Sequence, residues 1–410
     1  MSETEVTTAP RPLLLTDGRP ADRAWSLDPA LKHLNHGSFG AVPLVAQERQ
    51  ELLRVEMERS PVVWFPALPQ RIAAARVELA DFLRVDAGDL ALVPNASAGA
   101  SVVYAALTLR PGGEIVVTDH GYGAVTMGAE RLARRYGGRV RTARVPLDAD
   151  ADQAYEAVVA ELCDATELVV VDQITSATAR RFPVERIGAE ARRRGVPVLV
   201  DGAHAPGLLD APLADAAYDV WTGNLHKWGC APRGTAALVA RGPLRELLHP
   251  LIDSWAAADP FPDRFDQQGT VDATAYLAAP TSLAFIERTW GWPAARRYMD
   301  DLADYGARVI GDAVAGPTDP VDVGMPVPGM RLVRLPDGLA ADRVEADALR
   351  DRVALELGVE AAFTSFDGIG YMRLSAHVYN TAADYEYFAE ECVPVLGRWA
   401  RENGRKRSAQ

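Results

Sequence analysis

The sequence predicts an α/β protein with a doubly wound, mostly parallel sheet. Short runs rich in β-branched residues alternate with amphipathic helical stretches between about residues 40 and 280. Several of these runs are apolar throughout, which is the pattern of parallel strands covered by helices on both faces. The composition, 48% hydrophobic and 24% charged, is that of an ordinary globular protein and excludes disordered, collagen-like and coiled-coil chains.

The predicted elements come in a regular order. Two helices are expected first, over 43–60 and 68–85, because apolar residues recur there at spacings of three and four. Helical stretches then separate most of the predicted strands. The seven strands expected for the large sheet are 90–94, 114–119, 139–145, 166–174, 196–202, 218–224 and 235–241.

A second, smaller α+β region is expected from about residue 281. A long helical stretch opens it, and a Pro/Gly-rich segment separates that stretch from the later elements. These are predicted as a strand over 330–336, a helix over 345–358, a strand over 370–377 and a closing helix over 381–401. The predicted domains are therefore a flexible arm (1–25), a large domain (26–280), a small domain (281–403) and a tail (404–410).

Charge and motif content exclude several classes of function. A net charge of −13 argues against nonspecific nucleic-acid binding. No run approaches eighteen apolar residues and the N-terminus lacks the features of a secretory signal, so we expect a cytoplasmic protein without membrane contacts. The three cysteines form no CxxC pair, which favours a reducing compartment, and the scattered histidines predict no metal site.

Lysine is rare in this chain, and one lysine has a favourable setting. The 43 basic residues include only three lysines, and Lys227 follows a predicted strand by a few residues. Burying an ammonium beside a strand end is costly, and the same desolvation makes the amine a nucleophile toward aldehydes. Asp201 ends another apolar strand, at the sheet edge where α/β proteins bind ligands. The alternatives are a helix-capping Asp201 and a solvent-exposed Lys227.

An amine and a strand-end carboxylate are what pyridoxal phosphate needs: one partner for its aldehyde and one anion for its pyridine nitrogen. Its phosphate also needs backbone donors, which the start of a helix supplies. The segment VPNASAGAS offers such a helix start around Ser97, although Asn95 or Ser97 could equally be an ordinary N-cap.

Four motifs together resemble a known family. DGAHAPG, GNLHKW, LNHGSFG and MRLSAHVYNT are similar to the class V aminotransferases, which are fold type I pyridoxal-phosphate enzymes. Within that family, the sequence most resembles the isopenicillin N epimerase-like branch, which has similar members in lincosamide pathways. The likeness covers about residues 30–400, and the motifs are specific for the cofactor but not for the reaction.

The resemblance implies a set of site residues. Lys227 would hold the cofactor as a Schiff base and act as the base at Cα, Asp201 would pair with the pyridine nitrogen, and His204 would lie close to the ring. The other implied cofactor contacts are Ser97, Ala98, Asn224 and His226 at the phosphate, Tyr122 stacked on the ring, Gln173 near the ring hydroxyl, and Gly269 and Thr270 from the partner subunit of a homodimer. The implied substrate contacts are Arg373, for the carboxylate, and the loop residues His36, Gly37, Ser38 and Phe39.

Two departures from the family pattern leave the reaction open. The family's SPTG turn reads SATA over Ser176–Ala179, and Gln173 stands where a histidine is more usual. We expect an enzyme of natural-product biosynthesis that acts on an amino-acid unit of a larger molecule. A C–S lyase acting on a cysteine S-conjugate by β-elimination ranks first, followed by an epimerase and by decarboxylation coupled to oxidative deamination. A cofactor-free scaffold protein is the remote alternative.

Overall fold

The computed structural model of the chain describes residues 8–214, 217–315, 321 and 324–408, which fall into two compact units. The first unit contains the chain up to Phe39, the short segment Ala177–Ala179, and the chain from Thr289 onward. The second contains Gly40–Ser176 and Arg180–Arg288. The predicted boundary at residue 280 therefore falls inside a helix of the second unit, α8 (Thr274–Thr289).

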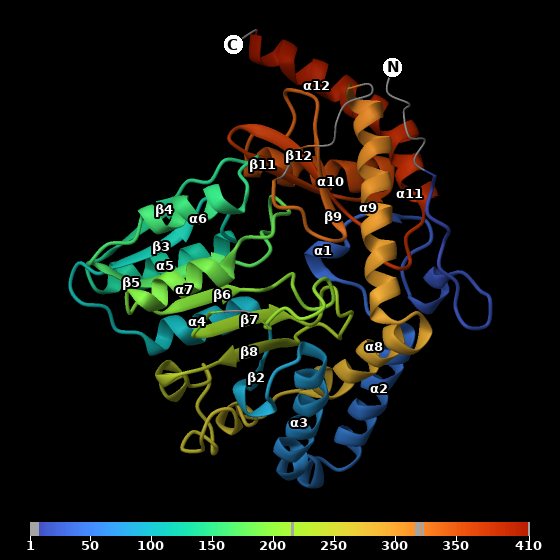
Figure 1. The fold of residues 1–410 in the computed structure, drawn as a ribbon. Coiled ribbons are helices and arrows are strands. Elements are labelled where there is room, and N and C mark those ends of the chain that lie inside the picture. The colour runs from blue at the N-terminus through green and yellow to red at the C-terminus, as the bar shows by residue number, and fades with distance from the viewer. Residues whose placement is uncertain (1–7, 215–216, 316–320, 322–323, 409–410) are drawn as a thin grey trace. The chain divides into compact units, whose positions relative to one another are not determined.

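The second unit is built on the predicted seven-stranded sheet, whose strand order is β2-β8-β7-β6-β5-β3-β4 (Figure 1). Its strands are β2 (Leu90–Val93), β3 (Glu114–Thr118), β4 (Arg139–Ala143), β5 (Thr166–Asp172), β6 (Val198–Asp201), β7 (Val220–Asn224) and β8 (Ala236–Ala240). Only β8 runs in the direction opposite to the other six strands, because it pairs antiparallel with both β7 and β2. The prediction of a mostly parallel seven-stranded sheet is thus confirmed.

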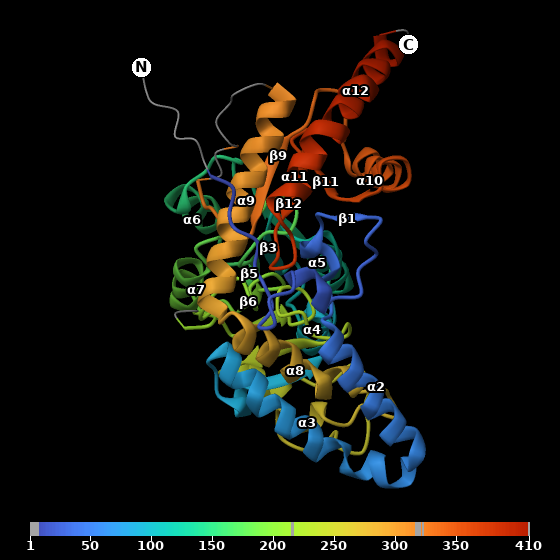
Figure 2. The same ribbon diagram turned by 90° about the vertical axis from the view of Figure 1, so that its right-hand side faces the viewer.

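Helices cover both faces of this sheet. The helices of this unit are α2 (Leu44–Arg59), α3 (Pro61–Leu83), α4 (Ala96–Ala106), α5 (Gly123–Arg135), α6 (Ala151–Ala160), α7 (Val184–Arg193) and α8. A hydrophobic core joins α4 and α5 to alternate strand residues such as Leu168, Val170 and Leu199. The pair α2 and α3 lies side by side (Figure 2).

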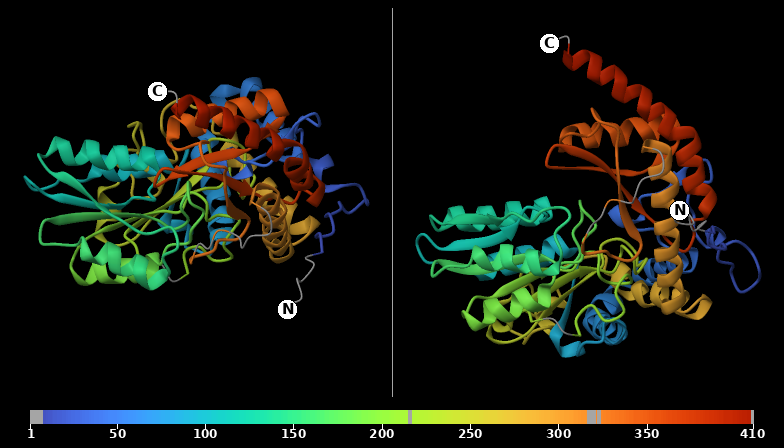
Figure 3. Two further views of the ribbon diagram at one scale, coloured as in Figure 1. Left: turned by 90° about the horizontal axis from the view of Figure 1, so that it is seen from above. Right: turned by 45° about the horizontal axis from the view of Figure 1, so that its top comes forward.

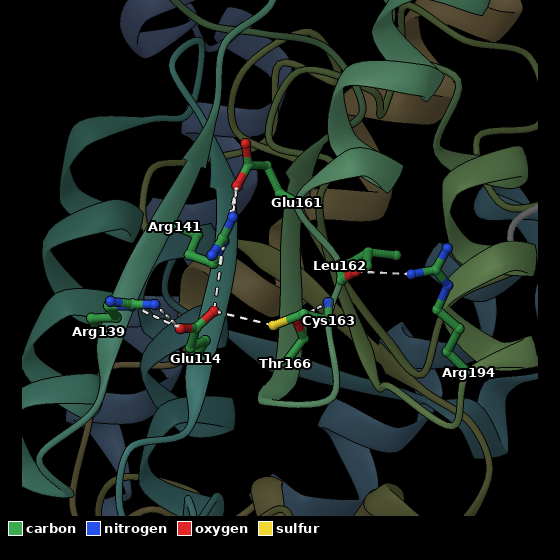
Figure 4. A network of polar contacts seen from close by, with 8 residues as sticks. All are labelled: Glu114, Arg139, Arg141, Glu161, Leu162, Cys163, Thr166 and Arg194. Atoms are coloured by element: carbon green, nitrogen blue, oxygen red, sulfur yellow. Dashed lines mark hydrogen bonds and ion pairs between the residues drawn. The ribbon is translucent and has the colours of Figure 1, made fainter.

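A polar network lies at the amino-terminal ends of the strands, opposite the carboxyl-terminal ends that carry the candidate site. Glu114, the first residue of β3, accepts hydrogen bonds from Arg139 Nε (2.7 Å) and Cys163 Sγ (3.4 Å), as Figure 4 shows. Arg141 continues the network to Glu161 (2.6 Å). These arginines lie on β4, an edge strand, and charged side chains there discourage pairing with another chain.

The first unit contains a three-stranded antiparallel sheet of order β11-β12-β9, and its core packs around residues such as Leu34, Tyr385 and Phe388. Its strands are β9 (Met330–Arg334), β11 (Ala362–Phe366) and β12 (Ile369–Ser375), and a separate pair joins β1 (Lys32–His33) to β10 (Val359–Glu360). Its helices are α1 (His36–Phe39), α9 (Trp292–Ala315), α10 (Arg343–Leu357), α11 (Ala382–Tyr387) and α12 (Val393–Ser408). A π-helical turn (Phe388–Cys392) joins α11 to α12. The C-terminal helix α12 is drawn in red in Figure 3.

The N-terminal segment differs from the predicted flexible arm. Residues 8–25 include the short helix η1 (Ala21–Ala24), and Trp25 is buried and stacks on Trp290. Residues 26–39, predicted within the large domain, cluster with the C-terminal part of the chain because β1 pairs with β10. The predicted tail also differs, since α12 continues to Ser408. Residues 1–7, 409 and 410 lie outside the described ranges.

Candidate functional site

The candidate site lies at the carboxyl-terminal ends of β6 and β7. Asp201 is the last residue of β6, and Asn224 is the last residue of β7. The chain then forms the loop that carries Lys227 and returns as β8. Asp201, His204 and Lys227 are all buried, with 2%, 1% and 8% of their surfaces exposed. The structure therefore brings together the three residues predicted to be catalytic, within one unit.

Hydrogen bonds fix the protonation of the Lys227 amine. Lys227 Nζ lies 3.0 Å from Nε2 of His204, and the indole N–H of Trp228 donates to Nδ1 of the same ring (3.2 Å). An indole nitrogen can only donate, so Nδ1 must accept and a neutral His204 must carry its proton on Nε2. The amine then accepts that proton's hydrogen bond, which requires an uncharged Lys227. An uncharged amine is the form that attacks an aldehyde.

Asp201 presents an unused oxygen to the site. Its Oδ1 accepts a hydrogen bond from the backbone N–H of Ala203 (2.9 Å), whereas Oδ2 is buried and has no hydrogen-bond partner among the described residues. Burial raises the pKa of Asp201, and the hydrogen bond from the Ala203 N–H opposes this rise. A buried carboxylate oxygen without a donor fits the protonated pyridine nitrogen of pyridoxal phosphate.

The backbone N–H groups at the N-terminus of α4 can bind an anion, although two of them already donate hydrogen bonds within the protein. Asn224 Oδ1 accepts the N–H of Ala96 (2.8 Å), and Asn95 caps the helix by accepting the N–H of Ala98 (2.9 Å). Gly99 lets the helix approach β7 closely, because a β-carbon there would lie 2.2 Å from Thr222 Oγ1. Of the two predicted phosphate donors, Ala98 would have to share its N–H with Asn95. Ser97 lies between Ala96 and Ala98 at the same helix end.

His226 is uncharged in this loop. Its Nδ1 lies 2.9 Å from the carbonyl oxygen of Thr235, and burial lowers the pKa of His226 to about 4. Any contact of His226 with a phosphate would therefore be a hydrogen bond from a neutral ring. Gly269 and Thr270, the predicted contribution to a partner subunit, are exposed at the surface of this unit.

Gln173 lies on the other face of the sheet from Asp201. Its Oε1 accepts from Trp221 Nε1 (2.9 Å), and its Nε2 donates to the carbonyl of Pro212 (2.6 Å). Thr222 is in register with Asp201 on the neighbouring strand and points to the same face of the sheet. Trp221 precedes Thr222 along β7 and therefore points to the opposite face. This geometry gives no support to the predicted role of Gln173 beside the ring hydroxyl. Tyr122 stands at the start of α5 and is 44% exposed.

The SATA segment keeps the backbone shape that a glycine would give. Ala179 stands where the family has the glycine of SPTG, and it adopts a left-handed φ of 50°. A left-handed φ costs about 1–2 kcal/mol for a residue with a β-carbon. The alanine at this position therefore adds backbone strain to the turn.

The predicted substrate contacts belong to the first unit, where several of them meet. Arg373 on β12 is 3% exposed, and its Nη2 donates to Ser38 Oγ (2.9 Å) and to Asn35 Oδ1 (3.1 Å). His36 stacks on His377 with a centroid distance of 3.9 Å and lies 2.9 Å from the Tyr379 hydroxyl through its Nδ1. Phe39 is 69% exposed and takes no part in this cluster.

Sequence reasoning missed several residues of these clusters. Asp172 ends β5 beside Asp201 and is equally buried, and the signal that selected Asp201, an acid ending an apolar strand, was present there too. Asn35 lies in the quoted motif LNHGSFG, but its bond to Arg373 spans 338 residues and leaves no local signal. Trp228 was visible only as a bulky neighbour of Lys227.

Comparisons with known proteins identify the family of this chain. Residues 66–388 match the model of the family described as aminotransferase class-V. The chain is 32% identical over 408 residues to the isopenicillin N epimerase of Streptomyces clavuligerus, covering 94% of this chain and 100% of that protein. It is 27% identical to a probable chloroplastic L-cysteine desulfhydrase of Arabidopsis thaliana, covering 87% and 81%.

A solved structure confirms the predicted fold. The cystine C–S lyase C-DES, in complex with cysteine persulfide, superposes with a TM-score of 0.75 at 21% identity, covering 90% of this chain and 97% of that one. The fold and the family match lead to one conclusion. The chain belongs to the class-V aminotransferase family and is a pyridoxal-phosphate-dependent enzyme that acts on amino acids.

Proposed function

We propose that this enzyme is a C–S lyase that releases a thiol from a cysteine S-conjugate by β-elimination. Lys227 is the proposed base, and Asp201 and the N-terminus of α4 are proposed to hold the pyridine nitrogen and the phosphate. The chemistry that bound pyridoxal phosphate supplies is an electron sink for the bonds at the substrate's Cα. Arg373 is the proposed ligand of the substrate carboxylate, because a guanidinium binds a carboxylate with two hydrogen bonds.

The observation that carries this proposal is the supply of proton-transfer groups in the second unit. Epimerisation needs a proton carrier on each face of Cα, whereas β-elimination needs one base. Lys227 provides that base. Burial raises the pKa of Cys230 far above neutral pH, which disfavours the release of its proton and so its use as a second carrier. Burial raises the pKa of Tyr104 in the same way, and its hydroxyl donates to the Val125 carbonyl (3.0 Å).

The proposed steps balance in atoms and electrons. Lys227 takes the proton from Cα, the Cβ–S bond breaks, and sulfur leaves with the bonding electrons and gains a proton. The remaining unsaturated amine reacts with water to give pyruvate and ammonia. The family relative named an L-cysteine desulfhydrase supports chemistry on cysteine sulfur, and a larger thiol from natural-product biosynthesis is the proposed leaving group.

An amino-acid epimerase is the second candidate, favoured by the 32% identity to isopenicillin N epimerase. Decarboxylation coupled to oxidative deamination is the third, and it would act on the same kind of substrate. The buried, donor-free Oδ2 of Asp201 argues against a cofactor-free scaffold, because a scaffold has no use for an unsatisfied buried carboxylate.

One experiment separates these candidates. The holoenzyme is given a panel of cysteine S-conjugates and amino acids in deuterated water, and the products are identified by mass spectrometry. Release of equal amounts of thiol, pyruvate and ammonia is the expected result. Substrate recovered with deuterium at Cα and no thiol would establish the epimerase instead, and loss of carbon dioxide would establish the third reaction.

A further inference from the structure

Asp172 is a second buried carboxylate beside Asp201. The parallel strands β5 and β6 pair in a register that sets Asp172 directly opposite Asp201. Paired residues on neighbouring strands lie about 5 Å apart and point to the same face of the sheet. Both side chains are almost fully buried, with exposures of 4% and 2%. Two carboxylates therefore share one edge of the proposed cofactor site.

The two carboxylates make different contacts. Asp201 keeps Oδ2 without a partner among the described residues, open to a ligand. Asp172 instead accepts a hydrogen bond from the backbone N–H of Tyr122. Tyr122 is the N-cap residue of α5 and provides no side-chain cap of its own. The carboxyl group of Asp172 thus anchors the turn that carries the proposed ring-stacking residue, while Asp201 keeps an oxygen for the proposed cofactor.

The surroundings favour a single negative charge on this pair. Burial and the Asp201 carboxylate raise the pKa of Asp172 well above its usual range, and the Tyr122 N–H opposes this only in part. Tyr104 on α4 faces both carboxylates, and burial together with their charge raises its pKa and keeps it neutral. His120, on the same turn as Tyr122, lies 2.7 Å from the Val145 carbonyl through its Nε2. Two carboxylates this close cannot both ionise cheaply.

We propose that Asp172 is a positioning residue of the cofactor site: it stays protonated, holds the Tyr122 turn through its carbonyl oxygen, and leaves the single charge of the pair on Asp201. That charge then lies where the pyridine nitrogen requires it. The role rests on the proposed assignment of Asp201 to this nitrogen. It requires no knowledge of which substrate bond breaks.

Asp172→Asn tests this role, because asparagine keeps the carbonyl acceptor and has no charge. Folded protein holds the Asp172 proton at pH values where unfolded protein has released it, so this residue lowers stability as pH rises above about 4. The apoprotein melting temperature of D172N, minus that of wild type, should therefore become more positive between pH 5 and pH 8. At neutral pH, D172N should bind pyridoxal phosphate with the wild-type visible absorbance and with an affinity within about threefold.

Two further variants complete the test. Asp172→Ala loses the anchor for Tyr122 and should bind pyridoxal phosphate more weakly than D172N, whereas Asp201→Asn should lose the wild-type absorbance. An Asp172→Asn protein that behaves like D201N would overturn the proposal, as would a melting-temperature difference that does not change with pH. The melting experiment uses apoprotein, so a failure of the C–S lyase assignment would leave its result intact.

Discussion

The indole N–H of Trp228 and Nδ1 of His204 lie 3.2 Å apart, and this bond determines which ring nitrogen of His204 faces Lys227 with a proton. Phenylalanine at position 228 would retain the packing and remove the donor. The other His204 tautomer then becomes available, and it can stabilise a protonated Lys227. We expect Trp228→Phe apoprotein to capture pyridoxal phosphate about three- to tenfold more slowly at neutral pH, as one lost hydrogen bond implies.

The rate at which visible absorbance develops measures this effect, and raising the pH should restore it. Trp221→Phe is the matched control, because it removes the indole donor to Gln173 on the opposite face of the sheet. Equal slowing in both variants would contradict the tautomer argument.

Gly40 packs against the backbone of the lysine loop. A β-carbon on Gly40 would lie 2.0 Å from the carbonyl oxygen of His226 and 2.9 Å from that of Lys227. Gly40→Ala should therefore push this loop out of place, lower stability by about 1–3 kcal/mol and accelerate cofactor loss on dialysis. Gly234→Ala is the control: it has a similar positive φ, 84° against 70°, but open space around it. Equal cofactor loss from both variants would show that backbone strain, and not the contact with the lysine loop, causes the effect.

A buried ion pair supports the loop that leads to Gly269 and Thr270. Arg76 donates to both carboxylate oxygens of Asp266 (2.8 and 2.9 Å), and burial raises the pKa of Asp266 to about 7 despite this arginine. Arg76→Met leaves a buried acid without its partner and should cost about 3–5 kcal/mol of unfolding free energy at neutral pH.

The pH dependence of that loss follows from the raised pKa. The contribution of Asp266 to wild-type stability falls as pH rises from about 4 to about 7, because the folded state retains a proton that the unfolded state releases. Without Arg76 the fall extends to higher pH, so the deficit should be larger at pH 8 than at pH 5 in denaturant titrations. Arg71 lies on α3 like Arg76 and forms an exposed pair with Glu56 of α2, so Arg71→Met should change stability by less than about 1 kcal/mol.

Kinetic measurements can distinguish the proposed role of Arg373 in substrate binding from its structural contacts. Arg373→Lys keeps a positive charge but cannot bind a carboxylate with two parallel hydrogen bonds. We expect KM to rise about ten- to a hundredfold with a smaller change in kcat. Arg331→Lys on the adjacent strand should leave KM unchanged, because its partners Asp300 and Asp304 accept from an ammonium as well.

The second unit also exposes an apolar surface that suits a homodimer. Trp255 is 93% exposed, and Leu251, Ile252 and Val271 are between 41% and 54% exposed. The methyl Cγ2 of Ile252 lies 4.0 Å from a β-carbon position on Gly269, so this surface adjoins the predicted contribution to a partner's phosphate site.

Trp255→Glu should shift sedimentation from dimer toward monomer and weaken cofactor binding in parallel. Leu355→Glu, at a similarly exposed position of α10 (86%), should change neither. A wild-type protein that sediments as a monomer at micromolar concentration would refute the homodimer.

The sequence allowed the large sheet to be predicted because its strands are apolar runs that carry their own signal. It failed where structure depends on distant partners. The strand pair β1 and β10, which ties the N-terminal segment to the C-terminal unit, joins residues more than 320 positions apart. Strand β11 was missed although Asp367–Gly368, both at positive φ, is a favoured hairpin turn. The face on which Gln173 lies depends on strand register, which composition does not reveal.

The single antiparallel strand, β8, has a consequence for how the lysine loop tolerates change. A parallel strand would require a long crossover after β7, whereas β8 lets the chain turn back within eleven residues. Both flanks of the loop are fastened, because the N–H groups of Leu225 and His226 donate to the Thr235 carbonyl at 3.1 and 3.2 Å. The loop between Asn224 and Ala236 therefore cannot accommodate inserted residues without breaking these hydrogen bonds. We expect natural variation in loop length at other edges of the sheet.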